Sequence, residues 1–252
     1  MYTKEMENRT LVSAFFEDDR NAKMTFATAV TRMGGSFFEF QQREGETLRD
    51  AVMTMSSCGD LIVLKHPKKG AARAASLYAT IPVINAGDGG HNHPTQTLTD
   101  LLTIHREKGR FENLTIGLCG DLKFGRTVHS LISAMSRYKG VKFVLISPEE
   151  LRVPEYVINE VLVPNNIDYV EVRDLEAAIG TLDILYMTRV QRERFFNEQD
   201  YIRLKDTYIL NSEKLNKAKN DLCIMHPLPR VNEIAVSVDN DPRACYFDQG
   251  LN

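Results

Sequence analysis

Leu114-Thr-Ile-Gly-Leu-Cys-Gly-Asp-Leu-Lys-Phe-Gly-Arg126 joins a short apolar run to a polar turn, and a helix-like sequence follows from Thr127. This order predicts a buried strand, a loop and a helix, which is the repeating unit of an α/β fold. More apolar runs follow along the chain, with helix-like segments between them. These runs are Val141–Ile146, Asp168–Val172, Asp183–Met187, Thr207–Leu210 and Leu222–Met225.

The same alternation precedes Leu114. Because each crossover between parallel strands returns the chain over a face of the sheet, we predict an α/β protein. We expect two doubly wound parallel-sheet domains with helices on both faces. The predicted strands are Leu11–Phe16, Ser36–Phe40, Asp60–Leu64 and Pro82–Asn85. The predicted helices are Asn21–Met33, Glu46–Cys58, Ala71–Ala79 and Thr95–Glu107.

A polar segment, Glu107–Asn113, separates the two series of elements and contains Gly109. Glycine commonly ends a helix, so the helix before this segment is expected to stop there. A chain of 252 residues is long enough for two small domains. We therefore predict a first domain at residues 1–108 and a second at residues 109–252.

Composition excludes several classes of protein. The chain has 31 Lys and Arg against 34 Asp and Glu, a net charge of −3, which argues against nucleic-acid binding through a basic face. No apolar run approaches the roughly 18 residues of a membrane-spanning helix, and the polar start does not resemble a secretion signal. The four cysteines lie far apart, without a C-x-x-C pair, so we predict a cytoplasmic protein without disulfides.

Polar residues follow most of the predicted strands. In open α/β sheets, ligands bind beyond the carboxyl ends of the strands. The Arg, His and Gln side chains in these segments therefore predict a cleft for an anionic small molecule. The segments are Glu17–Asn21, Lys65–Pro67, Ala86–Pro94, Gly120–Arg126, Thr188–Gln191 and His226–Arg230.

Two arginines and a histidine are the main candidates for ligand binding. Arg126 opens a predicted helix and Arg189 follows a predicted strand, and two planar guanidinium groups suit a dicarboxylate. Either arginine alone is equally compatible with an ordinary salt bridge. His93 and Gln96 can orient a carbonyl that gains charge during acyl-type transfer. A packed histidine at the start of a helix is the competing interpretation.

Motifs for other chemistries do not occur in the sequence. His91 and His93 form an H-x-H pair, but no third metal ligand lies at a useful spacing. The chain has no G-x-G-x-x-G, no G-x-x-x-x-G-K-[ST] and no G-x-S-x-G motif. These facts argue against nucleotide cofactors and serine-hydrolase chemistry, and we predict neither a cofactor nor a bound metal.

Four groups of residues carry a resemblance to a known family: Pro82–Gly89 with His93–Leu98, Gly120–Ser130, Asp183–Arg194, and His226–Val231. Together they resemble the aspartate branch of the aspartate/ornithine carbamoyltransferase family. The ornithine branch has HCLP where this chain has His226-Pro-Leu-Pro. The resemblance implies a carbamoyl-phosphate domain followed by an aspartate domain. It also implies a homotrimer, and leaves open whether a regulatory chain binds.

The resemblance further implies an activity and two groups of site residues. The activity is transfer of a carbamoyl group from carbamoyl phosphate to L-aspartate, in de novo pyrimidine biosynthesis. The residues that would act on the carbamoyl group are His93, Gln96 and Lys65. Those that would hold L-aspartate are Arg126, Arg189 and Gln191 through their side chains, and Leu228 and Pro229 through their backbone carbonyls.

The main departure from the family lies after the first predicted strand, where the family has S-T-R-T-R for the phosphate. Asp19 stands in place of the first serine and Asn21 in place of the phosphate-binding arginine. An aspartate there can cap the helix itself, and two like charges about 4 Å apart repel by about 4 kcal/mol at an effective dielectric near 20. We expect Arg20 and Lys23 to offset part of this charge, and donor binding to be impaired.

Three hypotheses stay open on the sequence alone. The first is a carbamoyltransferase of reduced efficiency. The second is a catalytically inactive homologue that acts through ligand binding or assembly, and the third is transfer from a carbamoyl or acyl donor without phosphate. The family's first and last helices have no counterpart before Leu11 or after Asn252, so uncovered apolar surface is expected on the first domain.

Overall fold

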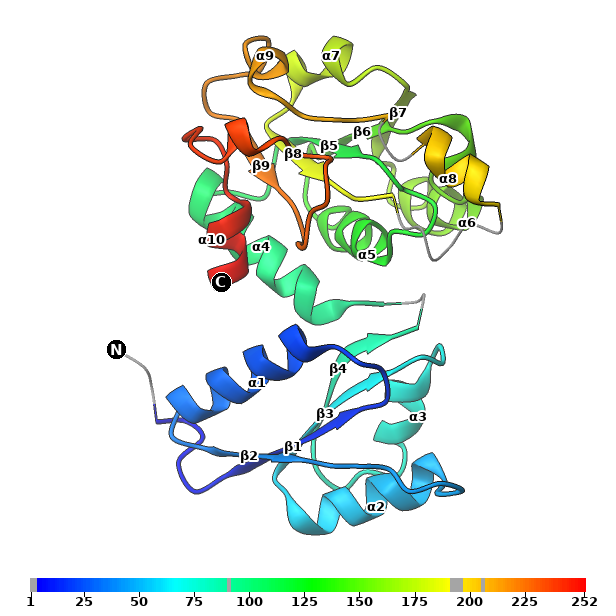
Figure 1. The fold of residues 1–252 in the computed structure, drawn as a ribbon, viewed down its shortest axis with the longest axis vertical. Helices are drawn as coiled ribbons and strands as arrows, with labels where there is room; N and C mark the ends of the chain where they lie inside the picture. Colours follow the sequence, from blue (N-terminus) through cyan, green and yellow to red (C-terminus); the bar gives the residue numbers. More distant parts are fainter. Residues whose placement is uncertain (1–3, 90–91, 191–196, 205–206) are drawn as a thin grey trace. The chain divides into compact units, whose positions relative to one another are not determined.

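The computed structural model describes residues 4–89, 92–190, 197–204 and 207–252. The chain forms two compact units, Met1–Thr95 and Gln96–Asn252, and each contains one parallel sheet with helices around it (Figure 1). The predicted α/β architecture of two parallel-sheet domains is therefore confirmed. Along the chain, the division between the units falls near the start of α4 (Pro94–Lys108), whereas the predicted domain boundary near Lys108 lies at the end of this helix and stays a prediction.

The first unit contains four strands: β1 (Thr10–Phe15), β2 (Ser36–Glu39), β3 (Leu61–His66) and β4 (Val83–Asp88). Its helices are α1 (Arg20–Arg32), α2 (Leu48–Cys58) and α3 (Ala71–Ser76). The strand order is β2-β1-β3-β4, and every pairing is parallel. Side chains alternate between the two faces of a strand. Leu11 and Val63 pack with Val30 of α1 on one face, whereas Val12 and Ile62 pack on the other, beneath α2 and α3.

The second unit contains five strands: β5 (Thr115–Cys119), β6 (Lys142–Ile146), β7 (Asp168–Val172), β8 (Ile184–Met187) and β9 (Cys223–Met225). Its longer helices are α4 (Pro94–Lys108) and α5 (Arg126–Met135). The shorter ones are α6 (Glu155–Val157), α7 (Leu175–Ala178), α8 (Glu198–Leu204), α9 (Ser212–Leu215) and α10 (Tyr246–Leu251). The strand order is β7-β6-β5-β8-β9, again parallel throughout. Ile104 of α4 and Leu131 of α5 fill the core on one face, and Leu175 of α7 and Leu215 of α9 on the other.

The prediction of a strand at Thr207–Leu210 is wrong. Only Leu210 pairs, in an isolated bridge to Ile234. Leu210 N–H donates to the Glu233 carbonyl (2.9 Å), and Ala235 N–H donates to the Leu210 carbonyl (2.9 Å). The facing segment belongs to the irregular chain after β9, so it offers no continuous row of partners for a strand.

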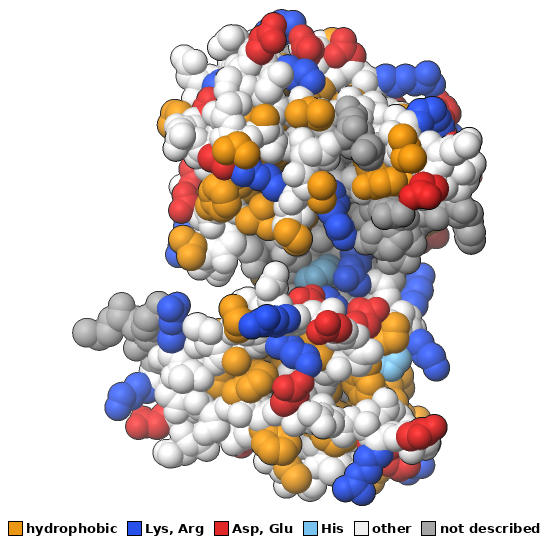
Figure 2. All heavy atoms as spheres, in the orientation of Figure 1, with side chains coloured by type: hydrophobic (Ala, Val, Ile, Leu, Met, Phe, Trp, Pro, Cys, Tyr) orange, Lys and Arg blue, Asp and Glu red, His pale blue; other side chains and the backbone are white. Residues whose placement is uncertain are grey.

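Several large apolar side chains of the first unit lie at its surface. Leu77, at the end of α3, is 76% exposed, and Met24 and Phe38 are each 59% exposed. Figure 2 shows apolar side chains interspersed with charged ones on the drawn face of this unit. On this face, the exposed apolar side chains therefore lie among charged ones. Within the described ranges, no helix has both the length and the apolar character needed to cross a membrane.

Candidate functional site

Asp19 caps the first helix of the first unit. Its Oδ1 accepts a hydrogen bond from the backbone N–H of Ala22 (3.0 Å), and α1 begins directly after it at Arg20. A carboxylate at this position is stabilised by the helix dipole and by N–H groups that lack partners within the helix. The helix cap that the sequence predicts at Asp19 is therefore present.

The other carboxylate oxygen of Asp19 binds a lysine from a neighbouring strand. Lys65 lies near the end of β3, where it is in register with Phe15 of β1, and its side chain is 5% exposed. Its Nζ lies 2.5 Å from Oδ2 of Asp19. Burial raises the pKa of Asp19, but the hydrogen bonds from Lys65 and Ala22 and the charges of Lys65 and His93 hold it below the usual value. We call Asp19, Lys65 and His93 the donor-side cluster.

The other three residues of the predicted phosphate site lie on α1. Lys23 forms an ion pair with Glu39 of β2, and Arg20 and Asn21 are exposed on α1. The cation bound to Asp19 is therefore Lys65, whereas Arg20 and Lys23 were expected to offset its charge. Lys65 is 46 residues away along the chain, so the pairing depends on the parallel contact between β1 and β3.

A hollow of about 430 Å³ opens at the carboxyl ends of β1 and β2. Its lining includes three acidic residues, Glu17, Asp18 and Glu39, and one basic residue, Lys23. Because Lys23 already pairs with Glu39, the lining carries net negative charge. Such a surface disfavours a phosphate ligand.

Sequence reasoning missed Asp88, at the end of β4. This carboxylate is 3% exposed and accepts hydrogen bonds from the backbone N–H groups of Gly70 (2.8 Å) and Asn92 (3.1 Å). It thereby fastens the segment that leads to His93 onto the start of α3. The signal in the sequence was an acidic residue among glycines directly after an apolar run. His91 lies outside the described residues.

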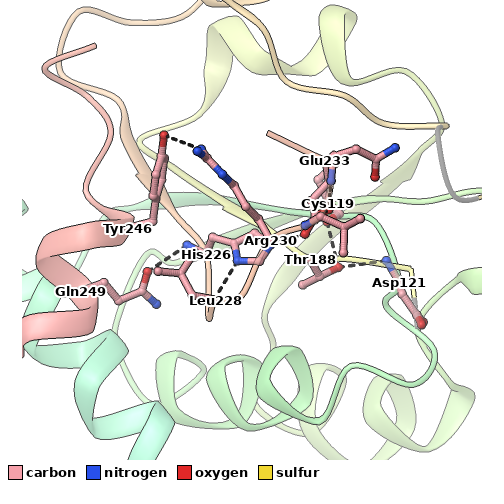
Figure 3. A network of polar contacts seen from close by, with 11 residues as sticks. Cys119, Asp121, Thr188, His226, Leu228, Arg230, Glu233, Tyr246 and Gln249 are labelled. Atoms are coloured by element: carbon pink, nitrogen blue, oxygen red, sulfur yellow. Dashed lines mark hydrogen bonds and ion pairs between the residues drawn. The ribbon is translucent and has the colours of Figure 1, made fainter. Parts of the chain in front are cut away.

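In the second unit, Gly120 lets the loop after β5 pass close to the end of β8. Its φ is +116°, and a Cβ atom there would lie 2.4 Å from the carbonyl oxygen of Thr188. The Thr188 hydroxyl accepts from Asp121 N–H (2.9 Å) and donates to the Cys119 carbonyl (3.0 Å), as Figure 3 shows. The two loops are therefore tied together at the carboxyl ends of adjacent strands.

Arg126 and Arg189 come from these two loops. Arg126 is the first residue of α5, and Arg189 directly follows Thr188; both are half-buried. Because β5 and β8 are neighbours, the structure places both arginines at one edge of the second sheet. Two guanidinium groups in this position suit a dicarboxylate. Gln191, the third residue predicted to bind L-aspartate, lies outside the described residues.

The loop after β9 is held by a buried histidine. Leu228 N–H donates to Nδ1 of His226 (2.8 Å), so Nδ1 carries no proton and Nε2–H donates to Glu233 (2.7 Å). Burial raises the pKa of Glu233, but hydrogen bonds from His226 and backbone N–H groups hold it below its usual value. The peptide bond between Leu228 and Pro229 is cis. The two hydrogen bonds of His226 hold the loop that carries the backbone carbonyls of Leu228 and Pro229 (Figure 3).

A buried carboxylate connects Gln96 to the last helix. Asp100 is fully buried and accepts hydrogen bonds from the side chains of Gln96 (2.9 Å), Gln249 (2.6 Å) and Tyr186 (3.1 Å). Burial raises its pKa to about 7, although the three donors act in the opposite direction. Gln249 accepts in turn from His226 N–H (2.8 Å). Sequence reasoning missed both Asp100 and Gln249, although Asp100 lies one helical turn after Gln96.

The described ranges contain no group of three or more His, Cys, Asp or Glu residues arranged to hold a metal ion. Four acidic residues of the two units, Asp19, Asp88, Asp100 and Glu233, instead accept hydrogen bonds from other groups of the chain.

Family models match both parts of the chain. One, described as the aspartate/ornithine carbamoyltransferase carbamoyl-P binding domain, matches residues 1–106. The other, described as the aspartate/ornithine carbamoyltransferase Asp/Orn binding domain, matches residues 112–252.

Individual relatives agree with the family models. The aspartate carbamoyltransferase catalytic subunit of Lachnoclostridium phytofermentans is 58% identical over 254 residues, covering 98% of this chain and 83% of the relative. That of Clostridium acetobutylicum is 57% identical, covering 100% and 84%. Among solved structures, the catalytic subunit of M. jannaschii aspartate transcarbamoylase has a TM-score of 0.92 at 41% identity, covering 99% of this chain and 82% of its own. The Trypanosoma cruzi enzyme in complex with carbamoyl phosphate has a TM-score of 0.91 at 35% identity, covering 100% and 81%.

Proposed function

The chain belongs to the aspartate/ornithine carbamoyltransferase family, and we propose that it transfers the carbamoyl group of carbamoyl phosphate to L-aspartate, with weakened binding of the donor. The observation that carries this proposal is the 58% identity, over 98% of the chain, to an aspartate carbamoyltransferase catalytic subunit. Such a reaction places the chain in de novo pyrimidine biosynthesis.

The acceptor side of the reaction is assigned to the second unit. Arg126, Arg189 and Gln191 hold the two carboxylates of L-aspartate, and the carbonyls of Leu228 and Pro229 accept hydrogen bonds from its amine. The half-buried positions of Arg126 and Arg189 at the ends of adjacent strands support this assignment. Guanidinium groups bind carboxylates through paired, charge-assisted hydrogen bonds.

In the proposed reaction, the protein transfers the carbamoyl group by holding carbamoyl phosphate and L-aspartate next to each other. The amine nitrogen forms a bond to the carbamoyl carbon, the bond from that carbon to the phosphate oxygen breaks, and the departing phosphate takes the amine proton. His93, Gln96 and Lys65 act on the carbamoyl group by orienting it and stabilising charge on its oxygen. Proximity and charge stabilisation supply the acceleration, without a covalent intermediate on the protein.

Weakened donor binding follows from the donor-side cluster. Asp19 already binds both the start of α1 and the ammonium group of Lys65, which are the two features that would attract a phosphate. The same contacts favour a second candidate function, an inactive homologue that acts through ligand binding or assembly. They are also compatible with a donor that lacks a phosphate.

Calorimetry of the full chain with N-(phosphonacetyl)-L-aspartate and with succinate separates these functions. The carbamoyltransferase proposal predicts that both bind and that carbamoyl phosphate with L-aspartate yields N-carbamoyl-L-aspartate. Binding of succinate without any turnover at millimolar donor would favour the inactive homologue. Turnover with a phosphate-free carbamoyl donor alone would favour the third possibility.

A homotrimer in the cytoplasm, with or without a regulatory chain, is the assembly that we propose from the family. The mass of the particle in solution tests it. A particle of three chains agrees with the proposal, and a monomer contradicts it.

A further inference from the structure

The hydrogen bonds around Asp100 have a fixed direction, set by a backbone group. His226 N–H donates to Oε1 of Gln249 over 2.8 Å. A backbone N–H can only donate, so the oxygen of the Gln249 amide faces His226 (Figure 3). The nitrogen of the same amide consequently faces Asp100, and it donates to Oδ1 over 2.6 Å.

The same reasoning extends from Asp100 to Gln96. Oδ1 of Asp100 accepts from Gln249, and it also accepts from Nε2 of Gln96 over 2.9 Å. Because Oδ1 already accepts from the Gln249 amide, any proton that Asp100 holds lies on Oδ2, and Gln96 must present its nitrogen to Oδ1. Oε1 of Gln96 therefore lies on the side of the amide turned away from Asp100.

Burial of Asp100 and Gln249 stabilises this orientation of the Gln96 amide. Asp100 is fully buried and Gln249 is 1% exposed, so water does not compete for their hydrogen bonds. Tyr186 donates to the second oxygen of Asp100 over 3.1 Å. In a site of low polarity, turning the Gln96 amide over would place its oxygen against Oδ1 of Asp100, and two facing acceptors are costly.

We propose that Asp100 and Gln249 are positioning residues that hold the Gln96 amide with its oxygen toward the carbamoyl group, where it accepts a hydrogen bond from the NH2 of that group. This inference rests on the proposed function, which places Gln96 at the carbamoyl group. An oriented amide oxygen favours an NH2 over a methyl group of similar size, because the methyl group offers no hydrogen to it. Asp100 and Gln249 thus contribute to the choice of a carbamoyl over an acetyl group without touching either.

Two ligands isolate this preference: N-carbamoyl-L-aspartate and N-acetyl-L-aspartate. They share the dicarboxylate and the carbonyl, and differ in NH2 against CH3. Neither carries a phosphate, so the weakened donor site does not enter the comparison. We expect calorimetry to show that the unaltered chain binds the carbamoyl ligand about tenfold more tightly, the scale of one hydrogen bond.

Two variants test the positioning role. The double variant Asp100→Asn with Gln249→Met leaves the amide at position 100 without a group that fixes its direction, so it can turn over and the preference should fall to about twofold or less. Asp100→Asn should keep it, because the asparagine oxygen can accept from both amides while its NH2 donates to the Tyr186 hydroxyl. Ile104→Val is the control, since it removes one buried methyl group one turn further along α4 and leaves the hydrogen bonds intact; it should also keep the preference.

Each outcome decides the inference. A preference that is unchanged in the double variant, or lost in Asp100→Asn alone, overturns it, and the second variant decides if the first does not fold. Equal affinity of the two ligands for the unaltered chain also overturns it, while leaving the proposed function in place. If neither ligand binds the unaltered chain, the proposed function fails and the inference fails with it.

Discussion

Oδ2 of Asp19 lies 2.5 Å from Nζ of Lys65, while Oδ1 of the same carboxylate accepts from Ala22 N–H at the start of α1. One acidic side chain therefore binds both a helix N-terminus and a buried ammonium group. Each of these is a common element of a phosphate site. In this chain both the helix N-terminus and the ammonium group are bound by Asp19.

Replacing Asp19 should open this position to anions. We expect Asp19→Ser to bind inorganic phosphate at least about tenfold more tightly than the unaltered chain, because the variant removes a negative charge and releases Lys65. Calorimetric titration with phosphate measures the change. Asp18→Ser is the matched control, since Asp18 is exposed and loses the same charge one residue away. An equal gain in both variants would mean that net charge alone is responsible.

The contact between Asp19 and Lys65 also predicts how stability depends on pH. The pKa of Asp19 is lowered in the folded state, so its contribution is complete above the unfolded value of 3.8 and is lost as the pH falls through the folded value. We expect Asp19→Asn to lower the free energy of unfolding by about 1–3 kcal/mol at pH 7, because Lys65 loses its counter-charge. Urea unfolding at pH 7 and at pH 3 should show a smaller difference at pH 3. A difference of the same size at both pH values would contradict a stabilising role for the ionised Asp19 carboxylate.

The effect of Asp100 on the free energy of unfolding should depend on pH in the opposite direction. Its pKa is raised from 3.8 to about 7 by burial, so the folded state holds the proton more strongly than the unfolded state. Ionisation of Asp100 therefore costs stability as the pH rises through this window. Asparagine at this position does not ionise. We therefore expect the free energy of unfolding of Asp100→Asn minus that of the unaltered chain to rise by up to about 1.4 kcal/mol per pH unit. Urea unfolding at pH 4.5, 6 and 8 measures this, and a relative stability without any slope would show that Asp100 is not perturbed.

Arg189 provides a test of the acceptor side. Arg189→Ala should weaken the binding of succinate by about 2–3 kcal/mol, the scale of lost hydrogen bonds to a charged group. Calorimetry on the full chain measures the effect. Arg152→Ala is the control, because Arg152 pairs with exposed Glu149 at the surface of the same unit. Succinate affinity that is unaltered by Arg189→Ala would remove Arg189 from the site.

The architecture could be predicted because local patterns determine it. The runs Leu114–Cys119 and Val141–Ile146 form β5 and β6 within one residue of their expected bounds. Asp19 could be predicted as a helix cap because capping involves only the next three residues. The run Thr207–Leu210 has the composition of a strand but lacks a neighbouring strand, and a single sequence does not reveal which segment lies opposite.

The contacts that define the candidate site could not be predicted, since they join distant parts of the chain. Lys65 reaches Asp19 only because β3 pairs with β1. Asp100 and Gln249 are 149 residues apart, and neither lies in a motif that suggests the other. A buried carboxylate with three donors has no local signature in sequence, because its environment is formed by the tertiary fold.

We propose that Asp19 of the protein itself occupies the position at which the S-T-R-T-R motif of the family holds the donor's phosphate. The most direct test of this claim is calorimetric titration with carbamoyl phosphate of the unaltered chain. In parallel, the same titration is made on a variant carrying Asp19→Ser, Arg20→Thr, Asn21→Arg, Ala22→Thr and Lys23→Arg. We expect the variant to bind carbamoyl phosphate at least about a hundredfold more tightly, because it places an arginine at position 21 and loses a competing carboxylate at position 19. Equally tight binding to both chains would contradict the claim.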